Sequence, residues 1–147
     1  MDKRNSSGGF TLVEMLLVVV IITTLAAMVV PRFTGRAKEA KIAAATADIQ
    51  ANIASALDLY EVDNGMYPTT EQGLAALLES PNAPPLPKKW RGPYLKKKGG
   101  LNDPWGTPYV YRSPGIHNTD DYDLYSLGPD GVEGNDDITN WDDNSKS

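Results

Sequence analysis

A single carboxylate interrupts an otherwise apolar run near the start of the chain. Residues 10–30 read FTLVEMLLVVVIITTLAAMVV, and Glu14 is the only charged side chain among them. As a helix, a segment of this length spans about 30 Å, the thickness of the hydrocarbon core of a bilayer. A charge at the centre of a membrane costs about 2.5–3.5 kcal/mol, so a carboxylate in such a segment indicates a functional site.

The residues before the apolar run predict how it is oriented. The polar segment 1–9 carries Lys3 and Arg4. Positive charge on this side predicts that the N-terminus stays in the cytoplasm and that the rest is exported. An ordinary signal peptide would have an apolar region of about 7–15 residues followed by a small-x-small site, for which Ala26-Ala27 is a poor candidate. A plain signal anchor is the other simple interpretation, but neither accounts for Glu14.

The sequence GGFTLVE at residues 8–14 resembles the processing site of type IV pilins and pseudopilins. The resemblance implies that a prepilin peptidase cuts after Gly9 and methylates the new amino terminus, Phe10. It also implies that Glu14 pairs with the terminal ammonium of a neighbouring subunit in a filament. Such a pair would offset the cost of a charge among packed apolar helices and would fix their register.

A helical pattern continues beyond the apolar run. Apolar residues recur at intervals of three and four, alanines fill the positions between them, and Asn64-Gly65 ends the pattern. We therefore expect a helix from Phe10 to Val62, about 80 Å long. Pro31 should bend or locally melt this helix, and it is also implicated in filament assembly because pilin-like proteins carry a proline here. A simple boundary of the membrane segment is the alternative for Pro31. The apolar positions are Ile42, Ala45, Ile49, Ile53, Ala56, Leu57 and Tyr60.

The remaining sequence predicts a small head in an α+β fold. Thr69 and Gln72 form a capping-box pattern that predicts a second helix, ending at Ser80-Pro81. Aromatic-rich runs at 108–112 and 122–127 are typical of short strands. We interpret three further aromatic residues as core and loop packing rather than as a ligand platform: Trp90, Trp105 and Tyr109.

Four stretches of the head resemble the major pseudopilins of type II secretion systems. They read YPTTEQGL from Tyr67, GPYLKK from Gly92, DPWGTPYVY from Asp103 and DLYSLGPDG from Asp123. The resemblance implies a type IV pilin-like fold, in which a long N-terminal helix packs on a small head with a short antiparallel sheet. It divides the chain into a leader, a membrane-spanning or filament-core helix, and a periplasmic head that includes the amphipathic half of the long helix to about residue 62. The three parts are residues 1–9, 10–30 and 31–147.

Hard oxygen donors concentrate in the sequence LGPDGVEGNDDI at residues 127–138. Ca²⁺ takes about six to eight oxygen ligands, but composition alone favours a solvated acidic loop, and the spacing is not that of an EF-hand. The resemblance instead implies one calcium ion that stabilises the C-terminal loop. The chain has no cysteine, so it cannot carry the disulfide that usually staples this region in type IV pilins. The implied ligands are the carbonyls of Leu127 and Val132 and the side chains of Asp130 and Asp137, with Asp136 and Asn135 as further candidates.

The sequence offers no catalytic constellation. His117 is the only histidine, and it lies in a turn-like Gly-Ile-His-Asn stretch that favours a surface position. No glycine-rich phosphate loop and no Gly-x-Ser-x-Gly motif occurs. We therefore expect no enzyme activity, in preference to an anchored periplasmic hydrolase. The net charge of -5 and the pI near 4.8 argue against nucleic acid as a partner.

The resemblance implies the major subunit of a periplasmic filament, anchored first in the bacterial inner membrane, that drives folded proteins through an outer-membrane channel. Its implied partners are copies of itself, minor pseudopilins, the prepilin peptidase, the inner-membrane assembly platform and the membrane. We also expect the base-rich stretch 88–98 to meet the acidic end of a neighbouring head. The alternatives are a surface pilus for adhesion, motility or DNA uptake, and a calcium-binding module on a simple anchor.

Overall fold

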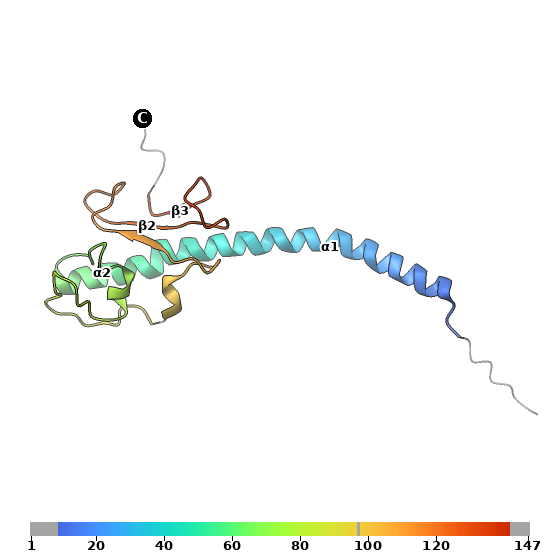
Figure 1. Ribbon diagram of the computed structural model, residues 1–147, viewed down its shortest axis with the longest axis horizontal. Coiled ribbons are helices and arrows are strands. Elements are labelled where there is room, and N and C mark those ends of the chain that lie inside the picture. Colours follow the sequence, from blue (N-terminus) through green and yellow to red (C-terminus); the bar gives the residue numbers. More distant parts are fainter. Residues whose placement is uncertain (1–8, 97, 142–147) are drawn as a thin grey trace, which may run out of the picture. The chain divides into compact units, whose positions relative to one another are not determined.

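The computed structural model describes residues 9–96 and 98–141, without the side chains of residues 29–34, 98 and 99. The predicted leader therefore lies outside the described residues, apart from Gly9. Contacts between residues divide the chain into two compact units, Met1–Glu39 and Ala40–Ser147. Helix α1 (Leu12–Ala47) begins in the first unit and ends in the second (Figure 1).

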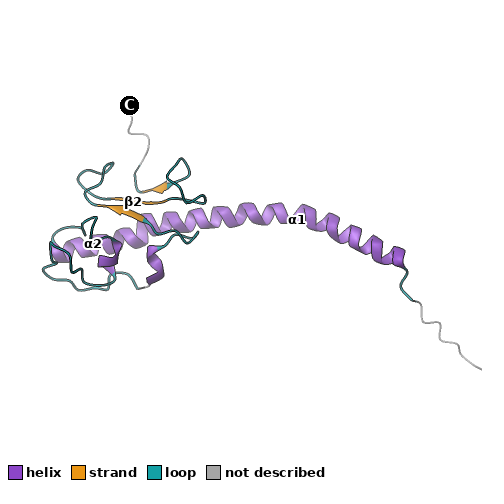
Figure 2. Cartoon of the chain, in the orientation of Figure 1, coloured by secondary structure: helices purple, strands orange, loops and turns teal. Residues whose placement is uncertain are grey.

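The first unit consists of the N-terminal part of α1. Every side chain described in it is exposed, including those of the apolar segment from Phe10 to Met28. The helix assignment runs through Pro31, so the helix does not melt there, and the alternative outcome for Pro31, a bend, stays a prediction (Figure 2). Within the described residues, no helix combines the length and the apolar character that crossing a membrane requires.

In the second unit the α-helix is interrupted at a point where the sequence predicted a continuous helix. A π-helix, η1 (Asp48–Asn52), separates α1 from α2 (Ile53–Asn64). Asp48 accepts hydrogen bonds from the Tyr109 hydroxyl at 3.0 Å and from the Asn52 amide at 2.7 Å. The predicted end of the helix is confirmed, because Gly65 adopts φ 81° and donates its N–H to the carbonyl of Glu61. A left-handed residue at this position is the common way to end a helix.

The predicted short antiparallel sheet is present. Strand β1 (Val110–Arg112) pairs with β2 (Asp123–Ser126), in the register Val110 to Tyr125. Strand β3 (Ile138–Thr139), which was not predicted, pairs with the other edge of β2 and gives the order β1-β2-β3. The acidic loop thus lies between two strands of one sheet, which fixes both of its ends (Figure 1).

The core of the head lies between the helical path and this sheet. One face of η1 and α2 supplies Ile49, Ile53, Leu57 and Tyr60, as the apolar periodicity predicts. Opposite them lie aromatic and aliphatic side chains from the sheet and its loops, so that burial of a continuous apolar cluster holds the small sheet on the helix. These side chains are Tyr109, Tyr111, Tyr122 and Leu124, with Leu74 and Leu77 from the segment between.

The predicted second α-helix is wrong, although its capping box is present. The Gln72 N–H donates to the Thr69 hydroxyl at 3.2 Å, and the Thr69 N–H donates to the Gln72 side chain at 3.1 Å. The chain then forms only a short 3₁₀-helix, η2 (Leu74–Leu77), because Gly73 takes φ 58° and ψ -169°, outside the helical region. A second 3₁₀-helix, η3 (Lys98–Leu101), follows later in the chain.

Two leucines of α2 provide a direct test of this core. Leu57 is fully buried, whereas Leu59 is 56% exposed. We expect Leu57→Ala to lower the free energy of unfolding of the head by about 2–5 kcal/mol, because the lost contacts leave a cavity. Leu59→Ala should change it by less than about 0.5 kcal/mol. Urea unfolding followed by circular dichroism measures both, and similar losses for the two variants would contradict this packing.

Candidate functional site

The N-terminal glutamate takes part in a local hydrogen-bond arrangement. The Oε2 atom of Glu14 accepts hydrogen bonds from the N–H of Thr11 at 2.9 Å and from its hydroxyl at 3.0 Å. The Glu14 N–H in turn donates to the Thr11 hydroxyl at 3.2 Å. This is a reciprocal capping box at the start of α1. Thr-x-x-Glu in the sequence is the signal that could have revealed it.

The capping box occupies only part of the glutamate. Within the described residues, the second carboxylate oxygen, Oε1, has no hydrogen-bond donor. Gly9 and Phe10 precede the helix and are exposed, Phe10 to 79%. The side chain of Pro31 lies outside the described residues, so its part in assembly stays a prediction. The predicted assembly residues at the N-terminus are therefore accessible, and Glu14 retains a free acceptor.

The acidic loop between β2 and β3 is tightly folded around glycines. Gly128 and Gly131 have φ values of 66° and 68°, which favour glycine. A side chain at Gly128 would collide with the backbone carbonyl oxygen of Asp136, at 2.6 Å from the added carbon. This close approach brings the two ends of the loop together. The Asp130 carboxylate accepts the Val132 N–H at 2.9 Å and fixes the turn between them.

Asp137 is the most informative acid of this loop. Its Oδ2 accepts the Gly134 N–H at 3.2 Å, while its Oδ1 is buried and has no hydrogen-bond partner. Burial raises the pKa of Asp137, the Gly134 N–H opposes that rise, and the negative charges of Asp136 and other acids add to it. An unpaired buried carboxylate oxygen is costly, and a cation would relieve that cost.

These features fit a calcium ion bound partly by backbone oxygens. Within residues 9–96 and 98–141, no three acidic or histidine side chains lie close enough together to hold a metal by themselves. Asp130, Asp136 and Asp137 are thus not brought together as a carboxylate set. Calcium, however, also accepts backbone carbonyls as ligands, and the implied set includes those of Leu127 and Val132.

Two residues outside the implied calcium ligands, Ser126 and Asp103, connect the start of the loop to the rest of the head through hydrogen bonds. The Ser126 hydroxyl donates to the buried carboxylate of Asp103 at 2.6 Å and accepts the Gly128 N–H at 3.1 Å. The other oxygen of Asp103 accepts the N–H groups of Trp105 and Thr107. Asp103 and Ser126 are far apart in the sequence, so no local pattern could have connected them to the loop.

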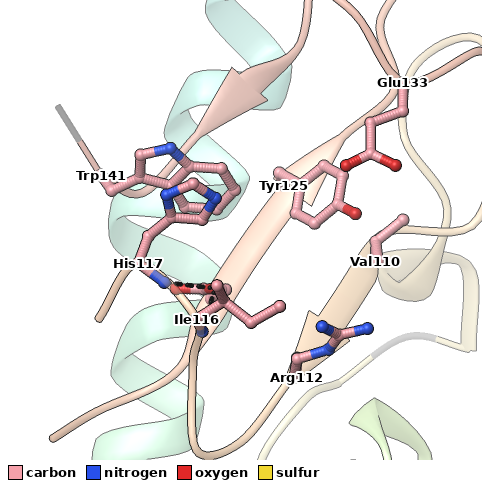
Figure 3. A pocket seen from close by; sticks show the side chains of 8 residues that line it. Val110, Arg112, Ile116, His117, Tyr125, Glu133 and Trp141 are labelled. Carbon is pink, nitrogen blue, oxygen red and sulfur yellow. Dashed lines mark hydrogen bonds between the residues drawn. The ribbon is translucent and has the colours of Figure 1, made fainter. Parts of the chain in front are cut away.

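A small cavity opens beside β1 and β2, with a volume of about 110 Å³ (Figure 3). At one wall, the imidazole of His117 stacks on the indole of Trp141 with ring centres 4.2 Å apart and planes 3° apart. His117 is exposed, as predicted. Across the cavity lie the side chains of Arg112 and Glu133, on either side of Tyr125 (Figure 3). Among the described residues, no side chain is hydrogen-bonded to the His117 ring, whose described contact is the stacking on Trp141.

Asp123 organises the turn that carries His117. Its carboxylate accepts the backbone N–H groups of Ile116, His117 and Asn118 at 2.6, 3.0 and 2.9 Å. Burial opposes ionisation of Asp123, but these three donors outweigh it and lower its pKa below the ordinary value. A side chain at Gly115 would collide with this carboxylate, so the turn requires glycine there.

The lowered pKa of Asp123 predicts acid sensitivity. A carboxylate whose pKa is depressed on folding stabilises the fold above its unfolded pKa of about 3.9, and this contribution is lost as the pH falls through the folded pKa. We expect Asp123→Asn to cost about 1–3 kcal/mol at neutral pH and less at strongly acid pH. Denaturant unfolding at several pH values measures this, with the exposed Asp120→Asn as control. A cost that does not depend on pH would exclude the charge as its cause.

Comparisons with known proteins find a family match for the N-terminal segment and another for the rest of the chain. The family described as type II secretion system (T2SS), protein G, matches residues 32–141, and the prokaryotic N-terminal methylation motif matches residues 4–30. The two matches meet near Pro31, where the apolar segment gives way to the rest of the chain.

Individual relatives match along nearly the whole chain. The type II secretion system core protein G of Pseudomonas aeruginosa is 51% identical over 145 residues, which cover 95% of this chain and 99% of that protein. The protein of the same description from Escherichia coli K12 is 47% identical and covers 90% of each chain. The crystal structure of the major pseudopilin of enterohaemorrhagic Escherichia coli superposes with a TM-score of 0.64 at 40% identity, over 73% of this chain and 87% of that one. The chain belongs to the protein G family of type II secretion systems, the major pseudopilins.

Proposed function

We propose that this chain is the major structural subunit of the periplasmic pseudopilus that drives export of folded proteins through a type II secretion system. The observation that carries the proposal is the match to the protein G family over residues 32–141. The N-terminal methylation motif before it supports the same conclusion. In this role the chain is a mechanical component rather than an enzyme.

The N-terminus supports a defined maturation step. A prepilin peptidase cuts after Gly9, and the new amino terminus at Phe10 is methylated. Both residues are exposed and precede the first turn of α1, where a protease can reach an extended chain. Before assembly, the apolar segment 10–30 lies in the inner membrane and the head lies in the periplasm. The apolar composition of the segment and the basic residues before it support this placement.

Glu14 sets the stagger between subunits in the filament. Its free oxygen, Oε1, accepts the terminal ammonium of a neighbouring Phe10, while Oε2 keeps its bonds to Thr11. The apolar side chains of the segment, all exposed in the single chain, then bury one another. Repeated contacts that do not close produce an open polymer. Pro31 marks the point where the helix adapts during assembly, and the minor pseudopilins and the inner-membrane assembly platform are the further partners of this polymer.

Calcium takes the place of the missing disulfide in the head. The carbonyls of Leu127 and Val132 and the carboxylates of Asp130 and Asp137 hold the ion, and Asp136, whose carbonyl oxygen lies close to Gly128, is a further ligand in this proposal. The unpaired buried oxygen of Asp137 is the observation that supports this assignment. The ion neutralises the loop and ties β2 to β3.

Deleting the gene and restoring it on a plasmid tests the proposed function. We expect exported enzymes to accumulate in the periplasm of the deletion strain and to reappear in the medium after complementation. Surface motility and DNA uptake should not change. Normal secretion together with lost motility would favour the surface pilus. A head that stays attached to an uncleaved anchor and forms no polymer would favour the simple calcium-binding module.

A further inference from the structure

The outward face of α2 carries an apolar stripe that nothing in the described head covers. Leu59, Val62 and Met66 are 56%, 80% and 47% exposed. Leu59 and Val62 are three residues apart and therefore lie on one face of α2, and Met66 follows directly after the helix has ended at Gly65. The opposite face carries the buried core residues Leu57 and Tyr60. An uncovered apolar stripe in a chain that forms polymers indicates a contact surface.

One side of this stripe is acidic. A groove of about 300 Å³ begins at Met66 and Glu61 and continues past Tyr67 to Asp120 and Asp121. The Tyr67 hydroxyl donates to the Asp58 carboxylate at 3.4 Å, and Glu61 and Asp121 line the same groove as Tyr67. Burial raises the pKa of the Tyr67 hydroxyl, and the negative charges of these three carboxylates raise it further. No lysine or arginine is among the described residues that line this groove.

The other side of the stripe is basic. Glu61 and Asp63 flank Val62 by about 100° in opposite directions around the helix, so they face opposite sides of the stripe. Arg91 lies 3.9 Å from Asp63, and the N–H of Lys89 donates to the Asn64 side chain at 3.2 Å. These contacts hold segment 88–91 against the end of α2, with the side chains of Lys88, Lys89 and Arg91 exposed.

We propose that the outward face of α2 docks a second copy of this chain, whose basic segment 88–91 enters the acidic groove beside Tyr67. The two charged sides of the face complement each other only between copies, because on one head the stripe separates them. Head-to-tail contacts of this kind do not close and therefore extend a polymer. The prolines at 84, 85 and 87 stiffen the chain before Lys88, so little ordering entropy opposes docking.

This docking refines the expectation that the base-rich stretch meets the acidic end of a neighbour. The acidic residues that would contact the basic segment in this docking are Asp58, Glu61, Asp120 and Asp121. The acids after Asp130 belong instead to the proposed calcium loop, and Lys97 lies outside the described residues. The inference rests on the proposed filament, but it concerns the contact between heads and not the N-terminal pairing of Glu14.

Engineered cysteines provide a clean test, because the chain has none of its own. The test uses the full-length protein, assembled in cells with its secretion machinery. We expect the double variant Met66→Cys and Lys88→Cys to form, on oxidation, a ladder of disulfide-linked oligomers larger than dimers. Each single cysteine variant should remain uncrosslinked. Dimers from Met66→Cys alone would indicate a symmetric face and overturn the head-to-tail docking. Absence of any ladder from assembled double-cysteine filaments would also overturn it.

Substitutions test the energetics of the same contact. Val62→Asp should reduce filament yield by about tenfold, the loss expected for one buried interface anchor. Ile116→Asp, also at an exposed apolar position, should leave it unchanged. The pair Lys88→Glu and Lys89→Glu should impair assembly, and adding Asp120→Lys and Asp121→Lys should restore it. Glu71→Lys is the control for acid reversal.

The outcomes separate this inference from the proposed function. If the Val62→Asp and Lys-to-Glu variants assemble as the wild type does, the docking is wrong while the filament remains. If the wild-type chain forms no filament under any condition, the proposed function fails first. Failure of the restoring charge swap, with all variants folded by circular dichroism, would show that these charges do not meet.

Discussion

Replacing Glu14 with glutamine is expected to abolish filament assembly and secretion while leaving cleavage after Gly9 intact. Glutamine preserves the capping box, because its side-chain oxygen can still accept from Thr11. The helix therefore starts at the same place, and only the negative charge is lost. A terminal ammonium buried without its partner costs about 3–5 kcal/mol at each contact. A repeated contact in a polymer cannot tolerate such a loss.

Thr11→Ala is the matched control for this substitution. It removes the cap and costs about 1 kcal/mol of helix stability, but it keeps the carboxylate. We expect the alanine variant to assemble and the Glu14→Gln variant not to. Quantifying cleaved subunits in membranes and subunits in sheared filaments distinguishes the two steps. Assembly of Glu14→Gln at the wild-type level would show that the charge has no role, and equal failure of both variants would assign the defect to the helix start.

Calcium is expected to stabilise the head by about 2.7 kcal/mol when it is present at 100 times its dissociation constant. A head that starts at Thr34 can be unfolded with calcium and with a chelator, at equal ionic strength. Asp137→Asn should remove most of the calcium-dependent gain. In chelator the same substitution should be neutral or stabilising, because it removes the negative charge of Asp137. One oxygen of that carboxylate, Oδ1, is buried without a partner, and neighbouring acids repel its charge.

Glu133→Gln is the matched control in the same loop. It also removes one negative charge, but Glu133 is exposed and is not among the implied ligands. We expect it to retain the calcium response. Magnesium should substitute poorly, because it requires a smaller octahedral site. If Asp137→Asn lowers stability equally in calcium and in chelator, Asp137 has a structural role only, and the acidic loop is solvated as composition alone suggests.

Local features of the sequence predicted local structure well. The end of α2 at Gly65 and the capping box of Thr69 and Gln72 depend on residues within one turn of each other, and both are present. The apolar periodicity located the buried face of η1 and α2, since a stripe at intervals of three and four can only be buried on one side. Segments 108–112 and 122–127 contain β1 and β2.

Predictions from neighbouring residues failed where residues distant in the sequence form hydrogen bonds with the predicted helices. The predicted second helix is reduced to Leu74–Leu77 partly because the carbonyl of Leu77 accepts hydrogen bonds from Tyr94 and Leu95. The π-helix at Asp48–Asn52 coincides with the bond from Tyr109, far along the chain. These partners meet only after the head has folded, so no window of the sequence contains both.

Reading along the chain is enough to recognise its family, the apolar segment with its one glutamate, and the acidic composition of the C-terminal loop. Each of these is a property of neighbouring residues. The folded head was needed to see which oxygen of Asp137 lacks a partner and that Ser126 and Asp103 support Gly128. It was also needed to see that the exposed Leu59 and Val62 lie between an acidic and a basic side of α2. Those features depend on which surfaces the packed head covers, and burial is a property of the whole fold.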